Sequence, residues 1–295
     1  MLKISKENKI YQMNQKNEGV ARVQSGAVIE FETADCFNDQ VTSAEQGVSK
    51  LDWEQINPAT GPVYVEGAAV GDVLKVHIQK ITISDRGVMA AIPDAGLFGE
   101  LVTEPEVKIL KIEAGYVHFN EAIKVPVNPM IGVIGVAPAG EGIPCGTPDS
   151  HGGNMDNKKI VEGSTLYFPV FVEGAMLAMG DLHAAMGDGE VMVTGVETSG
   201  AVVVQVEVIK GRSIDHPILE TEDHYYTIAS HKTLLEAVKI STAQMQKLVM
   251  EQLDLSFNEA GMLLSMAGNA EIAQVVDPLL TARFGLSKEI LPEIF

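Results

Sequence analysis

Short runs rich in valine and isoleucine recur along the first 215 residues, and glycine, proline or Asp-Gly pairs separate them. Several runs alternate apolar and polar residues with a period of two, which is the pattern of a half-buried β-strand. The clearest runs cover residues 27–31, 73–78, 107–112, 130–136 and 201–208. Because no amphipathic helix separates these runs, they favour an antiparallel sandwich or barrel over parallel βαβ units.

The pattern changes after Pro217, where apolar residues begin to recur at helical spacing. Residues 232–253 carry apolar side chains three and four positions apart, which predicts an amphipathic helix. Ser256 and Glu259 form the capping-box pattern that begins a second helix. We expect this second helix to end near Ala267, because Gly-Asn follows it.

Two further strands are expected after these helices, at residues 272–276 and 280–284, with an Asp-Pro pair between them. We therefore predict a mainly β protein in which an antiparallel β-sandwich over residues 1–215 bears the active-site loops. A smaller α+β portion over residues 216–295 should pack against this sandwich.

The balance of charge excludes some classes of partner. The 295 residues include 40 Asp and Glu against 21 Lys and Arg, for a formal net charge of -19. Such an excess repels nucleic-acid phosphates and anionic lipid surfaces. No run approaches the ~20 apolar residues of a membrane span, and the N-terminus lacks the apolar core of a signal peptide. We therefore expect a cytoplasmic protein that binds neither nucleic acid nor membrane.

The sequence holds two cysteines, Cys36 and Cys145, without CxxC spacing. Two cysteines are too few for a disulfide framework, so a reducing compartment is the simpler expectation. A nucleophilic Cys145 activated by a histidine is one alternative for catalysis. We favour an unreactive thiol at this position.

The segment 180–190 concentrates candidate chemistry, because Asp181, His183, Asp188 and Glu190 stand among three glycines. In extended backbone, residues two apart point to the same face, so each of the two pairs converges. Histidine with carboxylates suits zinc or another first-row divalent ion. The alternative is structural, since the Asp-Gly pair near the end of the segment is also typical of a hairpin turn before a strand.

A second loop, 148–156, repeats the Asp-x-His pattern of the first and makes a functional site the better interpretation. Its candidate residues are His151, Gly152, Gly153, Asn154 and Asp156. A third loop follows a predicted strand and contains Asp35 and Gln40. If the sheets bring the three loops together, Asp35 completes a metal site, while Gln40 or Asn154 orients a substrate carbonyl.

Several common catalytic motifs are missing from the sequence. It contains no Gly-x-Ser-x-Gly elbow, no P-loop and no Gly-x-Gly-x-x-Gly at the start of a helix. The serine-hydrolase, nucleotide-binding and dinucleotide-binding classes are therefore excluded.

Four segments together resemble the acetamidase/formamidase family, namely residues 57–68, 152–156, 180–190 and 274–278. The resemblance runs from about residue 10 to the end of the chain. It implies a β-sandwich enzyme that hydrolyses the C–N bond of short linear amides, releasing ammonia and a carboxylate. It also implies a homo-oligomer, a dimer or larger, and a divalent metal, which we expect to be zinc.

The resemblance assigns functional roles by position, to Asp35, Asn154, Asp156, Asp181, His183, Asp188 and Glu190, with His151 as a further candidate. One departure concerns Asn38 and Asp39, which precede Gln40 where we expect small residues. This departure predicts either a wider, more polar entrance to the substrate site or an additional cation ligand.

Our hypothesis is a hydrolase in which one metal, held by Asp35, Asp181, His183 and Asp188, activates water. Glu190 accepts the proton of that water and returns it to the leaving amine. Asn154, helped by the backbone of Gly152 and Gly153, polarises the amide carbonyl. Gln40 and Asp156 complete the substrate contacts, and His151 is a further catalytic candidate.

The alternative function is a non-catalytic β-sandwich that binds cations or a small polar ligand, with calcium held by the carboxylates. Calcium at a second site is also compatible with the acidic composition. His183 separates the two interpretations, because calcium seldom takes an imidazole ligand.

Overall fold

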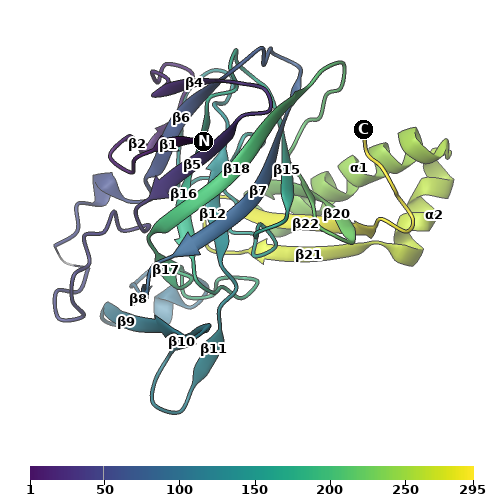
Figure 1. Ribbon diagram of the computed structural model, residues 1–295. Coiled ribbons are helices and arrows are strands. Elements are labelled where there is room, and N and C mark those ends of the chain that lie inside the picture. The colour runs from purple at the N-terminus through teal and green to yellow at the C-terminus, as the bar shows by residue number, and fades with distance from the viewer. Residues whose placement is uncertain (49) are drawn as a thin grey trace.

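The computed structural model describes residues 1–48 and 50–295. Within this part of the chain, two large sheets face each other (Figure 1). The first sheet has nine strands, in the spatial order β1 (Leu2–Ile4), β5 (Val28–Thr33), β18 (Gly200–Ile209), β7 (Val73–Ile83), β15 (Thr165–Pro169), β19 (Ile218–Glu220), β20 (His224–His231), β22 (Leu280–Ser287) and β21 (Asn269–Gln274). Neighbouring strands are antiparallel apart from the β1 and β5 pair.

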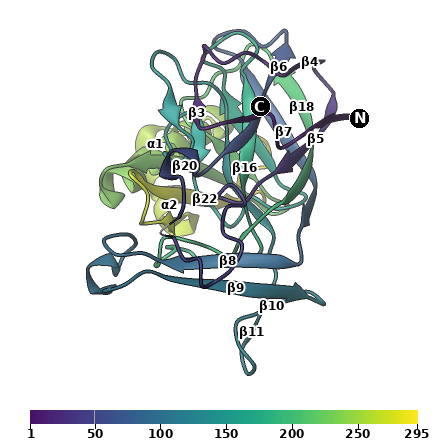
Figure 2. The same cartoon turned by 90° about the vertical axis from the view of Figure 1, so that its left-hand side faces the viewer.

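The second sheet contains the central strands of the candidate site. Its main path is β11 (Lys124–Pro126), β10 (Tyr116–His118), β9 (Glu106–Glu113), β8 (Arg86–Ala91), β17 (Glu197–Thr198), β16 (Leu177–His183), β12 (Met130–Gly135) and β14 (Gly152–Asn154). β6 (Ala59–Glu66) also pairs with β16, β2 (Lys9–Ile10) and β4 (Ala21–Gln24). Figure 2 shows β8 and β9 side by side beneath the sandwich. A short third sheet joins β3 (Gln12–Met13) and β13 (Ile143–Pro144).

The main core lies between the two large sheets and follows directly from the period-two pattern. On β18, Val202, Val204 and Val206 are fully buried, whereas Val203 and Gln205 are only partly buried. A strand with one buried face gains free energy mainly from that face, at roughly 25 cal/mol per Å² of apolar surface removed from water. The predicted strands at 27–31, 73–78, 107–112, 130–136 and 201–208 are confirmed as β5, β7, β9, β12 and β18.

The C-terminal residues form the helical part of the molecule and a second core. The helix α1 (Leu234–Leu253) packs across β20 and β22, and its own Met245 and Val249 are fully buried on the face toward these strands. The predicted capping box begins α2 (Phe257–Ala267), where Ser256 Oγ accepts from the Glu259 N–H and the Glu259 carboxylate accepts from the Ser256 N–H. Both predicted helices are therefore confirmed.

The two portions expected from the sequence share one sheet. β19 to β22 continue the nine-stranded sheet begun by the N-terminal strands, since β15 pairs with β19. A boundary at residue 215 would therefore divide a continuous hydrogen-bonded layer, and the division into 1–215 and 216–295 stays a prediction.

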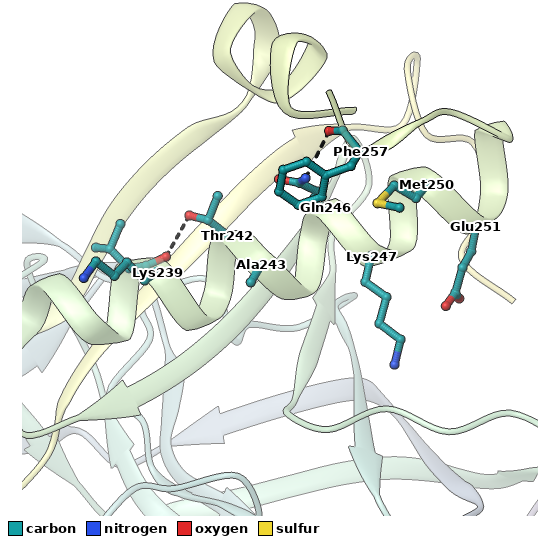
Figure 3. A pocket seen from close by; sticks show the side chains of 9 residues that line it. Lys239, Thr242, Ala243, Gln246, Lys247, Met250, Glu251 and Phe257 are labelled. Carbon is teal, nitrogen blue, oxygen red and sulfur yellow. Dashed lines mark hydrogen bonds between the residues drawn. The ribbon is translucent and has the colours of Figure 1, made fainter. Parts of the chain in front are cut away.

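A groove of about 520 Å³ runs along the outer face of α1. Figure 3 shows its side chains, among them Lys239, Lys247 and Glu251, and the hydrogen bond from Gln246 Nε2 to Phe257 O at 3.1 Å. A metal site needs at least two carboxylates or imidazoles close together. The lining of this groove includes one carboxylate, that of Glu251, and no imidazole. Of the helices in the described residues, none combines the length and apolar character that crossing a bilayer requires.

Candidate active site

The strand β16 carries the first two site residues, Asp181 and His183, at its C-terminal end. It lies between β12 and β17, and β6 pairs with its earlier residues. The backbone of Asp181 has a φ of 56°, in the left-handed region that non-glycine residues seldom adopt. His183 Nε2 lies 3.4 Å from Asp181 Oδ1, so the predicted convergence of these two side chains is present.

Three further acids from separate segments surround His183. Glu197 on β17 pairs directly opposite His183, and its Oε2 lies 3.1 Å from His183 Nε2. Asp156, which follows β14, places Oδ1 3.7 Å from the same nitrogen. Glu190, from the loop after β16, places Oε1 4.0 Å from His183 Nδ1. One imidazole therefore faces carboxylates on several sides.

Two glycines leave the space that this cluster occupies. A Cβ at Gly132 on β12 would lie 2.5 Å from Asp156 Oδ1 and 2.7 Å from Asp181 Oδ2. A Cβ at Gly195 would lie 2.4 Å from His183 Nδ1. Any other residue at these positions would displace a site side chain, so the glycines are part of the site's construction.

Burial strongly perturbs the acids of the cluster. Asp156, Asp181, Glu190 and Glu197 each expose 6% or less of their surface. Removal from water raises the pKa of Glu197 to about 8 and that of Asp156 to about 6. Burial, followed by the charge of Asp156, also raises the pKa of Glu190 well above its ordinary value.

His183 and Asp181 form a charged pair at the centre of the cluster. Burial opposes protonation of His183, yet the negative charges of Glu197 and Asp181 raise its pKa well above the ordinary value. Burial likewise opposes ionisation of Asp181, but His183 holds the pKa of that carboxyl below its ordinary range. Partly exposed Asp277 adds a fifth carboxyl, whose pKa is raised by burial and by Asp156 and Glu190.

Several buried atoms of the cluster lack a hydrogen bond. They are Asn154 Oδ1, Asp156 Oδ1, Asp181 Oδ1, His183 Nδ1 and Glu197 Oε2. Buried polar atoms without partners are rare in folded proteins and are commonly satisfied by water or an ion. Oxygen and imidazole donors in this arrangement fit a first-row divalent cation.

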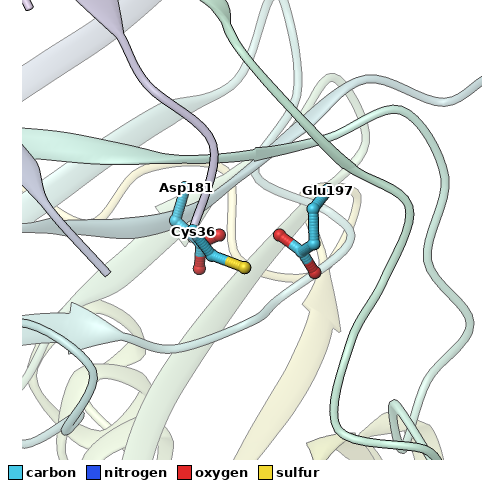
Figure 4. Close-up of side chains that lie close together, drawn as sticks. All are labelled: Cys36, Asp181 and Glu197. Carbon is cyan, nitrogen blue, oxygen red and sulfur yellow. The ribbon is translucent and has the colours of Figure 1, made fainter. Parts of the chain in front are cut away.

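Among the residues that the structure describes, two sets of side chains have the spacing of metal ligands. In one set, single donor atoms of Asp156, His183 and Glu190 all lie within 4.8 Å of one another. In the other set, Cys36, Asp181 and Glu197 meet the same limit, and Figure 4 shows their side chains close together. The two sets share no residue.

The cluster opens into a small pocket of about 170 Å³. Its polar lining consists of Cys36, Asn57, Asn154, Asp156, Asp181, Glu190, Thr194, Glu197 and Asp277. Its apolar lining includes Phe37, Trp53, Ile56 and Ile92. Since drug-sized ligands need pockets of roughly 300 Å³ or more, this pocket suits a smaller molecule.

The structure places two expected residues of the 32–40 loop outside this lining. Asp35 is buried, and its Oδ1 accepts from the Asp39 N–H at 2.8 Å; burial raises its pKa to about 6. The Gln40 side chain is bonded to the backbone of Asp52, donating to O at 3.3 Å and accepting from N at 2.8 Å. Lys6 contacts the Asp39 carboxylate at 2.6 Å, so that carboxylate already has a cationic partner.

Asp188 has a different environment from the other acids of its segment. Its carboxylate accepts two hydrogen bonds from Arg283, at 2.8 and 3.0 Å, and contacts Lys158 at 2.9 Å. Burial opposes ionisation, but these cations hold its pKa below the ordinary range. The Asp-Gly pair does not lead into a strand; instead Gly189 forms an isolated bridge with Gln274.

The 148–156 loop contributes Asn154 and Asp156 to the pocket lining. Its other candidates, His151, Gly152 and Gly153, are not part of that lining. His151 is fully buried, neither ring nitrogen is hydrogen-bonded, and burial lowers its pKa to about 4. Gly152 and Gly153 have φ values of 97° and 80° and pair with β12. A Cβ at Gly152 would lie 2.3 Å from Ile134 O, which explains the glycine there.

Sequence reasoning missed Glu197, Asp277 and Cys36 as members of the pocket. Glu197 is a single acid in a stretch without a nearby histidine, so only its cross-strand pairing with His183 reveals it. Asp277 follows β21 and accepts from Asn154 Nδ2 at 3.2 Å. The one sequence signal for Asp277 was its place inside the segment 274–278 that carried the family resemblance.

Comparison with known proteins decides the family. The model of the Acetamidase/Formamidase family matches residues 7–144 and 139–277. The chain belongs to the acetamidase/formamidase family. The resemblance found in the sequence is thus confirmed.

Relatives within the acetamidase/formamidase family include curated and solved proteins. A formamidase of Methylophilus methylotrophus is 26% identical over 250 residues, covering 65% of this chain and 61% of the relative. The chain thus spans less than two thirds of that curated relative. The crystal structure of an acetamidase from Bacillus halodurans has a TM-score of 0.97 and 47% identity, with 99% of each chain covered. The crystal structure of a predicted acetamidase/formamidase from Thermoanaerobacter tengcongensis has a TM-score of 0.97 and 49% identity, covering 99% of this chain and 97% of that one. These structures confirm the mainly β fold.

Proposed function

We propose that the protein hydrolyses small neutral amides of the formamide and acetamide class, releasing ammonia and a carboxylate, and that a divalent metal is required. The names of the family relatives support the substrate class. The pocket volume of about 170 Å³ supports a small substrate. The observation that carries the proposal is the buried imidazole of His183, surrounded by carboxylates with unpartnered oxygen atoms.

The geometry favours Asp156, Asp181, His183 and Glu197 as the residues that would hold the metal. Asp35 and Asp188, which the sequence analysis included, lie outside the cluster and have other partners. One imidazole with several carboxylates suits zinc better than calcium. When bound, such a cation supplies Lewis acidity that activates water at neutral pH and polarises a carbonyl. Calcium at a second site stays a prediction.

Glu190 is the proposed general base and acid. It lines the pocket, and its carboxylate approaches His183 without contacting a lysine or arginine. A cation in the cluster favours the ionised form of a neighbouring carboxyl. Ionised Glu190 would accept a proton from the attacking water and return it to the leaving nitrogen.

Asn154 is the proposed substrate-orienting residue. One hydrogen of its side-chain amide is donated to Asp277, and an amide nitrogen carries two. The second hydrogen is therefore available to the carbonyl oxygen of a bound amide, where it would stabilise developing negative charge. Asp156 lines the pocket and is a candidate both for binding the metal and for contacting the substrate. His151 is buried outside the pocket lining and is a candidate for supporting the loop that carries Asn154 and Asp156.

The decisive experiment measures ammonia release from formamide and acetamide by the purified protein. We expect release that a chelator abolishes and added zinc restores. Absence of release from both amides, with metal retained, would leave a cation-binding protein of the same fold. The homo-oligomer implied by the resemblance also stays a prediction, which size-exclusion chromatography with light scattering measures.

A further inference from the structure

Cys36 places a thiol in the pocket, next to two carboxylates of the cluster (Figure 4). Its Sγ and one oxygen each of Asp181 and Glu197 lie within 4.8 Å of one another. We propose that Cys36, Asp181 and Glu197 form a second, thiolate-containing metal site, so that the pocket binds two divalent cations. This inference rests on the proposed metal-dependent function and extends it to the number of ions and their ligands.

The first argument is that the cluster contains more donors than one ion needs. Cys36, Asp181 and Glu197 form a set at metal-ligand spacing, and Asp181 and Glu197, proposed above as ligands of the first metal, would be shared by the two ions. This set adjoins the first site, because His183 Nε2 lies 3.4 Å from Asp181 Oδ1 and 3.1 Å from Glu197 Oε2. Ions in two-metal hydrolytic sites lie roughly 3.5–4 Å apart, so one carboxylate can contact both ions.

The second argument is that two oxygen atoms of the thiol site contact the His183 imidazole but accept no hydrogen bond. Asp181 Oδ1 and Glu197 Oε2 are buried and make no hydrogen bond. Both residues expose 2% of their surface. A buried carboxylate oxygen without a donor is costly, and a bound cation removes that cost.

The thiol is held in place by its surroundings. The carbonyl oxygen of Cys36 accepts a hydrogen bond from the Asn57 N–H at 2.7 Å. The neighbouring Phe37 and Val41 pack with it in a small apolar core. Thiolate is a soft ligand that selects zinc, cobalt or cadmium over magnesium or calcium. The second site should therefore prefer such metals.

Cys145 provides a matched control. It is fully buried in a separate apolar cluster with Met13 and Val133, and its Sγ donates to Ile10 O at 3.5 Å. It does not line the pocket, which separates it from Cys36; burial raises the pKa of both thiols. A serine at this position changes a thiol without changing the proposed site.

The test reconstitutes the full-length metal-free protein with cobalt and combines metal counting with absorption spectroscopy. We expect two cobalt ions per chain and a near-ultraviolet charge-transfer band from thiolate to cobalt. Cys36→Ser should bind one ion and lose the band while keeping visible cobalt absorption. Cys145→Ser should match the unmodified protein. One ion per chain in the unmodified protein, or an unchanged band in Cys36→Ser, overturns the inference.

A second measurement needs no variant and covers the case in which Cys36→Ser fails to fold. X-ray absorption of the zinc-loaded protein should show one sulfur neighbour for every two zinc ions. A shell of nitrogen and oxygen alone overturns the thiolate site. Chelator-sensitive amide hydrolysis with a single bound ion would contradict this inference and leave the proposed function intact, whereas chelator-resistant hydrolysis would contradict the proposed function.

Discussion

His183 and Glu197 face each other across the paired strands β16 and β17, with His183 Nε2 3.1 Å from Glu197 Oε2. Both side chains are buried, and Glu197 Oε2 has no hydrogen bond. The strand register brings them together over a separation of 14 positions in the sequence. This pairing makes Glu197 as central to the candidate site as the Asp181 and His183 pair.

Replacing Glu190 with Gln should abolish most turnover without removing metal. The amide cannot accept a proton, and general acid–base catalysis contributes about 100- to 10,000-fold. We expect a loss of amide hydrolysis in that range, with metal content unchanged by elemental analysis. Glu121→Gln, at an exposed loop position, is the control. Activity in Glu190→Gln equal to that of the control would remove Glu190 from the mechanism.

Replacing Glu197 with Gln should weaken metal binding. The change keeps the size of the side chain and removes a negative charge beside His183 and Asp181. We expect the metal affinity to fall by at least about 10-fold, measured by competition with a chromophoric chelator. An affinity equal to that of the unmodified protein would exclude Glu197 as a ligand.

A methyl group at Gly132 should disrupt the site. The added Cβ would lie 2.5 Å from Asp156 Oδ1 and 3.0 Å from the backbone oxygen of Asp181, and neither a strand backbone nor a buried carboxylate can easily move. We expect Gly132→Ala to lose metal and about 1–3 kcal/mol of unfolding free energy. Gly187→Ala, where the Cβ meets nothing within 4 Å, should retain both properties. Equal metal content in the two variants would contradict the proposed geometry.

The metal-free protein should become less stable as the pH rises from 4.5 to about 8. The folded state raises the pKa of Glu197 from 4.5 to about 8, so it keeps a proton that the unfolded chain has lost. The stability contributed by this group is complete below pH 4.5 and is lost as the pH rises through 8. Thermal melts should show a smaller decrease in Glu197→Gln. A metal-free melting temperature with the same pH dependence in both proteins would refute this account.

Asp188→Asn should lower stability while leaving the metal in place. Arg283 exposes only 1% of its surface and depends on Asp188 for two of its hydrogen bonds. Weakening that pair should cost about 1–3 kcal/mol, measured by chemical denaturation. Loss of metal without loss of stability would instead support Asp188 as a ligand.

Much of the fold could be predicted because its signals are local. The period-two runs that became β7 and β18 reflect side chains alternating between core and solvent, and this alternation is visible in any window of six residues. The capping box of Ser256 and Glu259 is an interaction between residues three apart, so its physical partners are neighbours in the sequence. The combined motifs also sufficed to indicate the acetamidase/formamidase family, as the family comparison confirms.

By itself, the sequence determined the strand and helix content, the family, and the role of segment 180–190 in supplying Asp181, His183 and Glu190 to one cluster. Only the tertiary structure decided which other residues join them. Cys36, Glu197 and Asp277 enter the pocket through strand pairing and loop packing, whereas Asp188 is held by Arg283 and Gln40 by the backbone of Asp52. The physical reason is that backbone periodicity arises among near neighbours, while the partner of a charged or amide side chain is set by whichever distant segment the sheets bring within about 3 Å.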